Sequence, residues 1–162
     1  MTLRTLIGTP ALIVGCIVGC LAFAQQPDSQ DYFSAADLDR EGGTPPGRLF
    51  DHGNYYAAVA HREPGPGMSE SHRDWADLYF ISSGKATLIV GGSIVGGKET
   101  APGEVRGTSI EGGTRRTLAE GDVVHIPAGT PHHVIVAAGE QLTYFLVKVE
   151  DGANVEDANA AH

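Results

Sequence analysis

One stretch, GDVVHIPAGTPHHV at residues 121–134, constrains the fold of this chain more than any other. It places two prolines, two glycines and three histidines within fourteen residues. The apolar residues up to Ile126 favour a strand, Pro127 fixes its φ, and Gly129 permits the left-handed backbone of a tight turn. We therefore expect a strand, a tight turn and a returning strand that opens on His132, with the imidazole directed inward.

The rest of the chain also consists of short apolar runs separated by turn residues. With 162 residues, 22 glycines and 9 prolines, the chain has the size of one domain rich in tight turns. Runs of strand length lie at residues 55–60, 78–81, 86–90, 123–126, 134–136 and 142–149. This pattern predicts an all-β fold.

Between the third and fourth of these runs lies a glycine-rich segment, residues 91–121. It predicts a hairpin with a long surface excursion, with strand stubs at residues 94–95 and 114–118. The segment lies between strands and no helix follows it, so its glycines and lysine do not indicate a phosphate-binding loop.

The charge and the cysteines exclude several classes of function. The formal net charge is −9, which disfavours binding to a phosphate backbone or an anionic membrane, so no nucleic-acid partner is expected. Both cysteines, Cys16 and Cys20, precede residue 25. The chain beyond that point therefore has no disulfide, no thiolate nucleophile and no cysteine-rich zinc site. It also has no Gly-x-Ser-x-Gly element of a serine hydrolase.

The first 24 residues predict a secretory signal peptide. Arg4 precedes an apolar stretch that ends in Ala22-Phe23-Ala24, a small-x-small cleavage site. Two alternatives stay open. The stretch is long enough to serve as a permanent membrane anchor, and Cys20 follows an Ile-Val-Gly triplet that resembles the lipobox of bacterial lipoproteins. We expect an exported protein, periplasmic or secreted, with no membrane span after processing.

The remaining chain divides into three parts. Residues 25–47 are polar and rich in proline and glycine, which predicts a linker with one short helical turn. Residues 48–150 hold the predicted strands and form the barrel domain. Residues 151–162 form an alanine-rich tail that we expect to be flexible.

The spacing of Gly121, Pro127, Gly129 and His132 follows the second motif of the cupin family residue for residue. The chain therefore resembles a small, exported, single-domain bacterial cupin. The family pattern continues with an asparagine where this chain has Val136, a difference that removes a polar group but leaves the position of the metal-binding histidine intact.

The first cupin motif is present upstream in altered form. Counting back from Gly84 places Asp77 at the position of the family's glutamate. The same count places His72 at the second histidine and Glu70 at the first, while Pro64 stands where the leading glycine would be. The spacing is kept, but two of the four expected ligand types have changed.

The resemblance covers residues 50–149 and implies an antiparallel β-barrel with a jelly-roll path, often dimeric, that holds a divalent metal. Glu70 and His72 are two residues apart, so on one strand they share a face. With Asp77 and His132 they form a ligand set that suits Fe, Mn, Zn or Ni. If Asp77 is too short to reach, the other three make a set of two histidines and one carboxylate. A metal-free pocket is the alternative.

The resemblance implies no single reaction, because cupins include dioxygenases, isomerases, epimerases, storage proteins and ligand-binding proteins. Two functions stay open: a metal-dependent enzyme acting on a small molecule, as a dioxygenase or an isomerase, and a metal-free module that binds a small molecule without catalysis. No residue is singled out as a general acid or base, and the partner expected in either case is a small molecule.

Five further side chains are placed by strand alternation. His133 follows His132 directly and is expected to face solvent, and His125 is expected to be partly buried and hydrogen-bonded. Tyr79 should share a face with Asp77. Together with Tyr144 and Phe145 on the last strand, it would give the pocket a mostly apolar lining.

Overall fold

The protein is described by a computed structural model that covers residues 31–41 and 47–151. The predicted signal peptide with both cysteines, parts of the predicted linker, and the predicted tail after Asp151 lie outside the described residues. Within the linker, α1 (Ala35–Glu41) is longer than the single turn that was expected. It begins after Ser34, whose Oγ accepts a hydrogen bond from the backbone N–H of Asp37 at 3.3 Å. This helix, the one found in the described residues, is too short to cross a membrane.

The described residues otherwise form antiparallel strands, which confirms the all-β prediction. Their bounds are β1 (Gly47–Asp51), β2 (Tyr55–Arg62), β3 (Ser69–His72), β4 (Trp75–Val90), β5 (Ser93–Val95), β6 (Lys98–Ala101), β7 (Glu104–Gly107), β8 (Ser109–Glu111), β9 (Thr114–Ala119), β10 (Val123–Ile126), β11 (His132–Ile135) and β12 (Leu142–Glu150).

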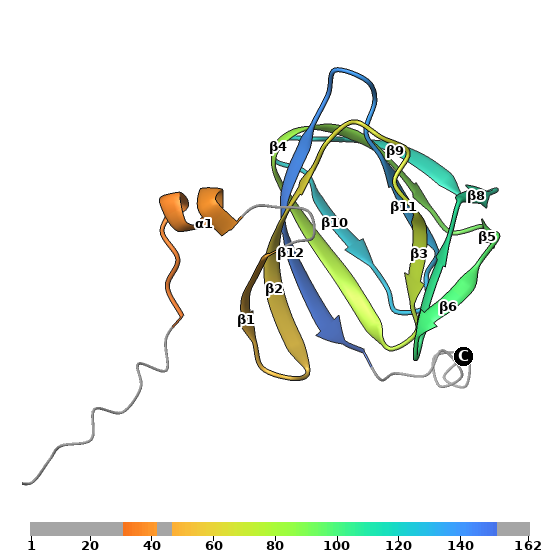
Figure 1. The fold of residues 1–162 in the computed structure, drawn as a ribbon, viewed down its shortest axis with the longest axis horizontal. Coiled ribbons are helices and arrows are strands. Elements are labelled where there is room, and N and C mark those ends of the chain that lie inside the picture. The colour runs from red at the N-terminus through yellow and green to blue at the C-terminus, as the bar shows by residue number, and fades with distance from the viewer. Residues whose placement is uncertain (1–30, 42–46, 152–162) are drawn as a thin grey trace, which may run out of the picture. The chain divides into compact units, whose positions relative to one another are not determined.

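Ten of these strands belong to one curled sheet. The main path runs β1-β2-β12-β4-β11-β3-β7-β6, β9 and β10 also pair with β4, and β5 and β8 form a separate two-stranded sheet. Figure 1 shows the strands wrapped around an interior, with β1, β2 and β12 on one side and β3, β6 and β11 on the other. Neighbours in the sheet are often far apart in sequence, as expected for a jelly-roll path.

The long strand β4 connects the two halves of the barrel. Its first half pairs with β10 and β12, and its second half pairs with β9 and β11. The sequence predicted two strands here because polar residues separate the apolar runs 78–81 and 86–90. In the structure, the inward-facing positions change from odd to even numbers between Ile81 and Ala86. A register shift opposite β12 and the left-handed Gly84, with φ of 85°, produce this change without ending the strand.

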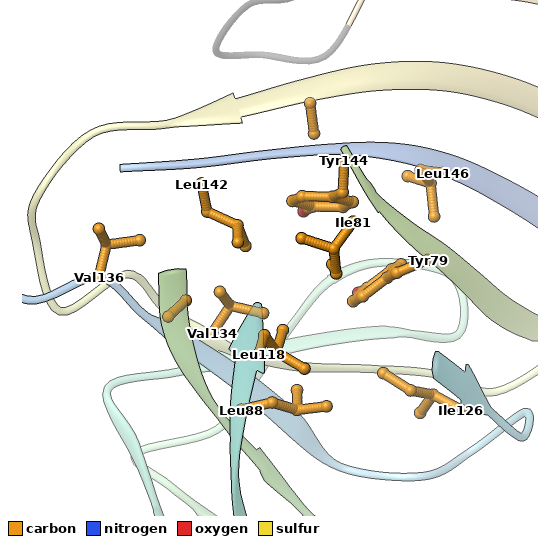
Figure 2. Packing of buried hydrophobic residues seen from close by; sticks show 12 residues of the cluster. Tyr79, Ile81, Leu88, Leu118, Ile126, Val134, Val136, Leu142, Tyr144 and Leu146 are labelled. Atoms are coloured by element: carbon orange, nitrogen blue, oxygen red, sulfur yellow. The ribbon is translucent and has the colours of Figure 1, made fainter. Parts of the chain in front are cut away.

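A cluster of buried apolar side chains fills part of the barrel (Figure 2). Val136, which replaces the family's asparagine, is only 4% exposed and belongs to this cluster, so its apolar character is explained by packing. The cluster consists of Ala60, Tyr79, Ile81, Ala86, Leu88, Leu118, Ile126, Val134, Val136, Leu142, Tyr144 and Leu146.

The glycine-rich segment is more ordered than the predicted surface excursion. The two stubs occur as β5 and β9, but β6, β7 and β8 were not expected. The reason is that β7 pairs along the whole of β3 and thereby extends the barrel sheet. This pairing brings two side chains of the segment to the candidate site.

Candidate metal site

Strand β3 carries the centre of the site. Glu70 lies opposite His132 of β11 on one side and opposite Arg106 of β7 on the other. His72, two residues along β3, lies opposite Glu104 of β7. Directly opposed residues of antiparallel strands share a face, so these five side chains gather on the inner side of the sheet.

Asp77 reaches the same place from β4. The turn at Arg73 and Asp74 separates β3 from β4. Inward-facing residues have even numbers on β3 and odd numbers at the start of β4, a change that the resemblance implied. Asp77 lies opposite Lys148 of β12, and both residues are buried. The four predicted site residues therefore converge, and a lysine that was not predicted joins them.

The potential ligand atoms of these four residues face one another. Nε2 of His132 lies 3.4 Å from Oε1 of Glu70 and 3.4 Å from Oδ2 of Asp77. Nε2 of His72 lies 3.6 Å from the same Oδ2. Glu70, His72 and His132 each offer one ligand atom within 4.8 Å of the others, so these three residues could hold a metal ion.

Both histidines have their other ring nitrogen held by a hydrogen bond. Nδ1 of His72 lies 2.7 Å from the carboxylate of Glu104, and Nδ1 of His132 lies 3.0 Å from the backbone oxygen of Thr130. In a neutral imidazole, donation from Nδ1 leaves the lone pair on Nε2. Both Nε2 atoms are buried and have no hydrogen-bond partner among the described residues. A metal ion would satisfy both atoms, so the residues present fit a metal.

The pKa values reflect the closeness of these groups. Burial alone would lower the pKa of His132, but the carboxylates of Asp77 and Glu70 raise it to about 9. Burial alone would raise the pKa of Glu70, but His132 and Arg106 lower it below its usual value. The carboxylates are therefore ionised at neutral pH, as metal ligands must be.

Asp77 is held at both oxygens. The hydroxyl of Tyr79 donates a hydrogen bond to Oδ2 at 3.1 Å, and Nζ of Lys148 lies 2.6 Å from Oδ1. Burial would raise the pKa of Asp77, but His132 and Lys148 lower it. Oδ2 therefore faces the two imidazoles as a fourth ligand would, while Oδ1 is paired with the lysine.

The site opens into a cavity of about 480 Å³. Its lining combines the site residues with aromatic, apolar and cationic side chains: Tyr56, Arg62, Met68, Glu70, His72, Asp77, Tyr79, Arg106, Tyr144, Leu146 and Lys148. A cavity of this size suits a small molecule.

Comparison with solved structures identifies the fold. An uncharacterized conserved protein with a double-stranded β-helix domain from Klebsiella pneumoniae is 18% identical, with a TM-score of 0.54 over 77% of this chain and 94% of that one. The chain has the double-stranded β-helix fold of the cupins. A Bacillus halodurans protein gives a TM-score of 0.54 at 11% identity, covering 78% of this chain and 86% of that one.

A cupin 2 conserved barrel domain protein from Salinispora arenicola is 22% identical, with a TM-score of 0.44 over 72% of this chain and 83% of that one. No protein-family model and no curated protein sequence matches the chain.

Two other histidine predictions were wrong. His133 is only 2% exposed, because the segment that leads into β3 covers it, and its Nε2 lies 2.6 Å from the backbone oxygen of Pro66. His125 is exposed on the outer side of β10. Tyr79 and Tyr144 line the cavity as expected, whereas Phe145 does not, since it alternates with Tyr144 along β12.

Sequence reasoning missed four charged residues: Arg62, Arg106 and Lys148, which line the cavity, and Glu104, which contacts His72. Period-two alternation contained a signal for two of them. Leu142, Tyr144, Leu146 and Lys148 fall on one face of β12, and Arg62 shares the parity of Tyr56 on β2. For Glu104 and Arg106 the sequence gave no such signal, because the pairing of β7 with β3 was not foreseen.

Proposed function

We propose that this protein binds one divalent metal ion in its cupin barrel and uses it to bind and transform a small molecule. Glu70, His72 and His132 would hold the ion, with Asp77 as the fourth ligand. The observation that carries the proposal is the pair of buried Nε2 atoms, which have no hydrogen-bond partner among the described residues and lie beside two carboxylates.

Imidazole and carboxylate ligands suit Fe, Mn, Zn or Ni, and four protein ligands leave positions for a substrate. When bound, such an ion supplies a Lewis acid that polarises an oxygen of the substrate. A dioxygenase and an isomerase are the two reaction types we propose to screen first.

The protein's own residues would prepare this centre. Glu104 and the backbone of Thr130 orient the imidazoles. Arg106 holds the second oxygen of Glu70, with Nη1 2.6 Å from Oε2, and Oε1 points to His132. Glu70, His72, Asp77 and His132 are nearly buried, with side chains at most 11% exposed, so the cavity rather than the outer surface is the route to the metal.

We also propose that the protein is exported, on the basis of the apolar N-terminal stretch and its Ala22-Phe23-Ala24 end. Mass determination of the protein recovered from cells tests this point. A chain that begins at Gln25 supports cleavage, an acylated Cys20 supports the lipoprotein alternative, and an intact N-terminus contradicts both.

Elemental analysis tests the metal site. The protein is purified without chelator and compared with His72→Ala, His132→Ala and, as a matched control, His125→Ala, which removes an exposed imidazole on β10. We expect near-stoichiometric metal in the parent and the control and little in the other two variants. Negligible metal in the parent after reloading with Fe, Mn, Zn and Ni would contradict the proposal.

A metal-free binding module is the second candidate, favoured by one observation. The carboxylates of Asp77 and Glu70 already have cationic partners in Lys148 and Arg106, so the cluster is paired without a metal. This candidate predicts ligand binding that is unchanged by chelator.

A further inference from the structure

Three cationic side chains line the cavity above the candidate metal site, in a protein whose net charge is −9. They are Arg62 of β2, Arg106 of β7 and Lys148 of β12. None of them can ligate a metal while charged, and Arg62 and Lys148 come from strands other than those that carry the four ligands. Their role therefore needs a separate explanation.

Lys148 has donor capacity to spare. Its side chain is 10% exposed, and its only ionic partner among the described residues is Asp77. Nζ lies 2.6 Å from Oδ1 of that carboxylate, a contact that uses one of its three N–H groups. A buried ammonium with unused N–H groups favours an acceptor in the cavity beside it.

Arg62, at another part of the cavity lining, also has N–H groups to spare. Its Nε donates to the hydroxyl of Tyr144 at 2.9 Å, and its guanidinium makes no other hydrogen bond among the described residues. A guanidinium presents a planar fork that suits a carboxylate. The remaining N–H groups of Arg62 are therefore available to an anion.

The charges of the cavity indicate the charge of the molecule that fits it. The carboxylates of Glu70, Asp77 and Glu104 balance the three cations. A divalent metal held by neutral imidazoles adds two positive charges in a poorly hydrated site. A ligand with two negative charges restores the balance.

The positions of Lys148 and Arg62 favour a ligand whose negative charges are separated. Lys148 lies opposite Tyr56 on β2, and Arg62 is six residues farther along the same strand, a span of about 20 Å between backbones. Both side chains point into the cavity, which shortens the distance between their charged groups. One compact anion cannot contact both ends as readily as a molecule with an acid group at each end.

We propose that the metal-loaded cavity binds a small dicarboxylate, with one carboxylate near the metal and Lys148 and the other near Arg62. Leu146 and the rings of Tyr79 and Tyr144 would pack against the connecting carbon chain. The inference rests on the proposed metal site.

Calorimetry on zinc-loaded protein tests it, with succinate, glutarate and adipate as probes. Butyrate, 1,4-butanediol and inorganic phosphate are the comparison compounds, and metal content is measured on the same samples. We expect at least one dicarboxylate to bind more tightly than every comparison compound. We also expect Lys148→Met and Arg62→Met each to weaken that binding by about tenfold to a hundredfold. Arg115→Met, which removes an exposed cation on β9, should leave it unchanged.

Several results would overturn the inference. The protein could hold zinc while the dicarboxylates bind no better than the diol or butyrate. That result would contradict the proposed dicarboxylate ligand and leave the proposed metal site intact. Tighter binding of phosphate would show that the cavity recognises one compact anion. If both variants fold and keep their metal without loss of affinity, the two cations do not recognise the ligand. Absence of zinc in the parent would contradict the proposed function as well.

Discussion

His72 donates its Nδ1 proton to Glu104, whose two carboxylate oxygens lie 2.7 Å away on the neighbouring strand β7. This bond fixes the ring so that Nε2 faces Asp77, 3.6 Å from Oδ2. It resembles the carboxylate-histidine pairs that support metal ligands in many proteins. A residue of the unpredicted strand thus controls the orientation of a predicted ligand.

Glu104→Gln should therefore weaken metal binding without removing it. Loss of the charged acceptor lets the imidazole reorient, and such changes reduce metal affinity by about tenfold to a hundredfold. Competition with a chromophoric chelator measures the effect. Glu111→Gln, at an exposed position of β8, is the control. Equal affinities for the two variants would show that Glu104 does not position His72.

Asp77→Asn should destabilise the chelated protein by about 3–5 kcal/mol, because it leaves the ammonium of Lys148 buried without a counter-charge. The double variant Asp77→Asn/Lys148→Met should regain most of this loss. Denaturant unfolding of the parent, both single variants and the double variant gives the interaction free energy between the two side chains. Additive effects would mean that the two side chains do not form the ion pair described.

The pH dependence of the chelated protein should report His132. Its pKa is about 9 in the folded protein and near 6.5 when unfolded. A raised pKa contributes stability that is complete below about pH 6.5 and is lost as the pH rises towards 9. His72 has a lowered pKa, so its contribution has the opposite sign and fades as the pH rises above the unfolded value near 6.5.

The melting temperature of the chelated protein should therefore fall between pH 6.5 and 9, and His132→Gln should flatten this slope. Metal affinity should rise over the same range, because the metal displaces the proton from His132. A parent and a variant with the same pH profile would contradict the assignment.

Gly84→Ala should destabilise the barrel strongly. A Cβ at this position would lie 2.0 Å from the backbone oxygen of Gln141, and the φ of 85° is already unfavourable for alanine. Gly139→Ala is the matched control, since it has φ of 79° and open space, and should cost about 1–2 kcal/mol. Thermal unfolding compares them. A similar loss for both would show that β4 and its neighbour can separate without penalty.

Much of the barrel and the four candidate ligands could be predicted from local sequence. The turn at Gly129 is a local property, and so is the spacing of two residues that puts Glu70 and His72 on one face of a strand. Spacing along the sequence was also enough to align the four candidate ligands with two family motifs. The residues that hold these ligands in place, Glu104 beside His72 and Arg106 beside Glu70, could not be predicted in the same way. Glu104 and Arg106 reach the site only through the register of β7 against β3, which short glycine-bounded strands do not reveal.

Lys148 was missed for a different reason. Its alternation with Leu146 and Tyr144 was visible, but a lysine is rarely buried unless it has a partner, so an outward position was the natural expectation. Its partner, Asp77, lies some seventy residues earlier on β4. Pairing between distant strands, which local patterns do not encode, decided the position of this charge.

The strand order has a consequence for the stage of folding at which the candidate site forms. Glu70 and His132 come together only when β11 pairs with β3. In the chain, the strands from β4 to β10 lie between these two. Pairing of strands so distant in sequence is slow, because the chain entropy is lost before the contacts form. The four candidate ligands therefore come together only after β3, β4 and β11 have paired, in a closed barrel.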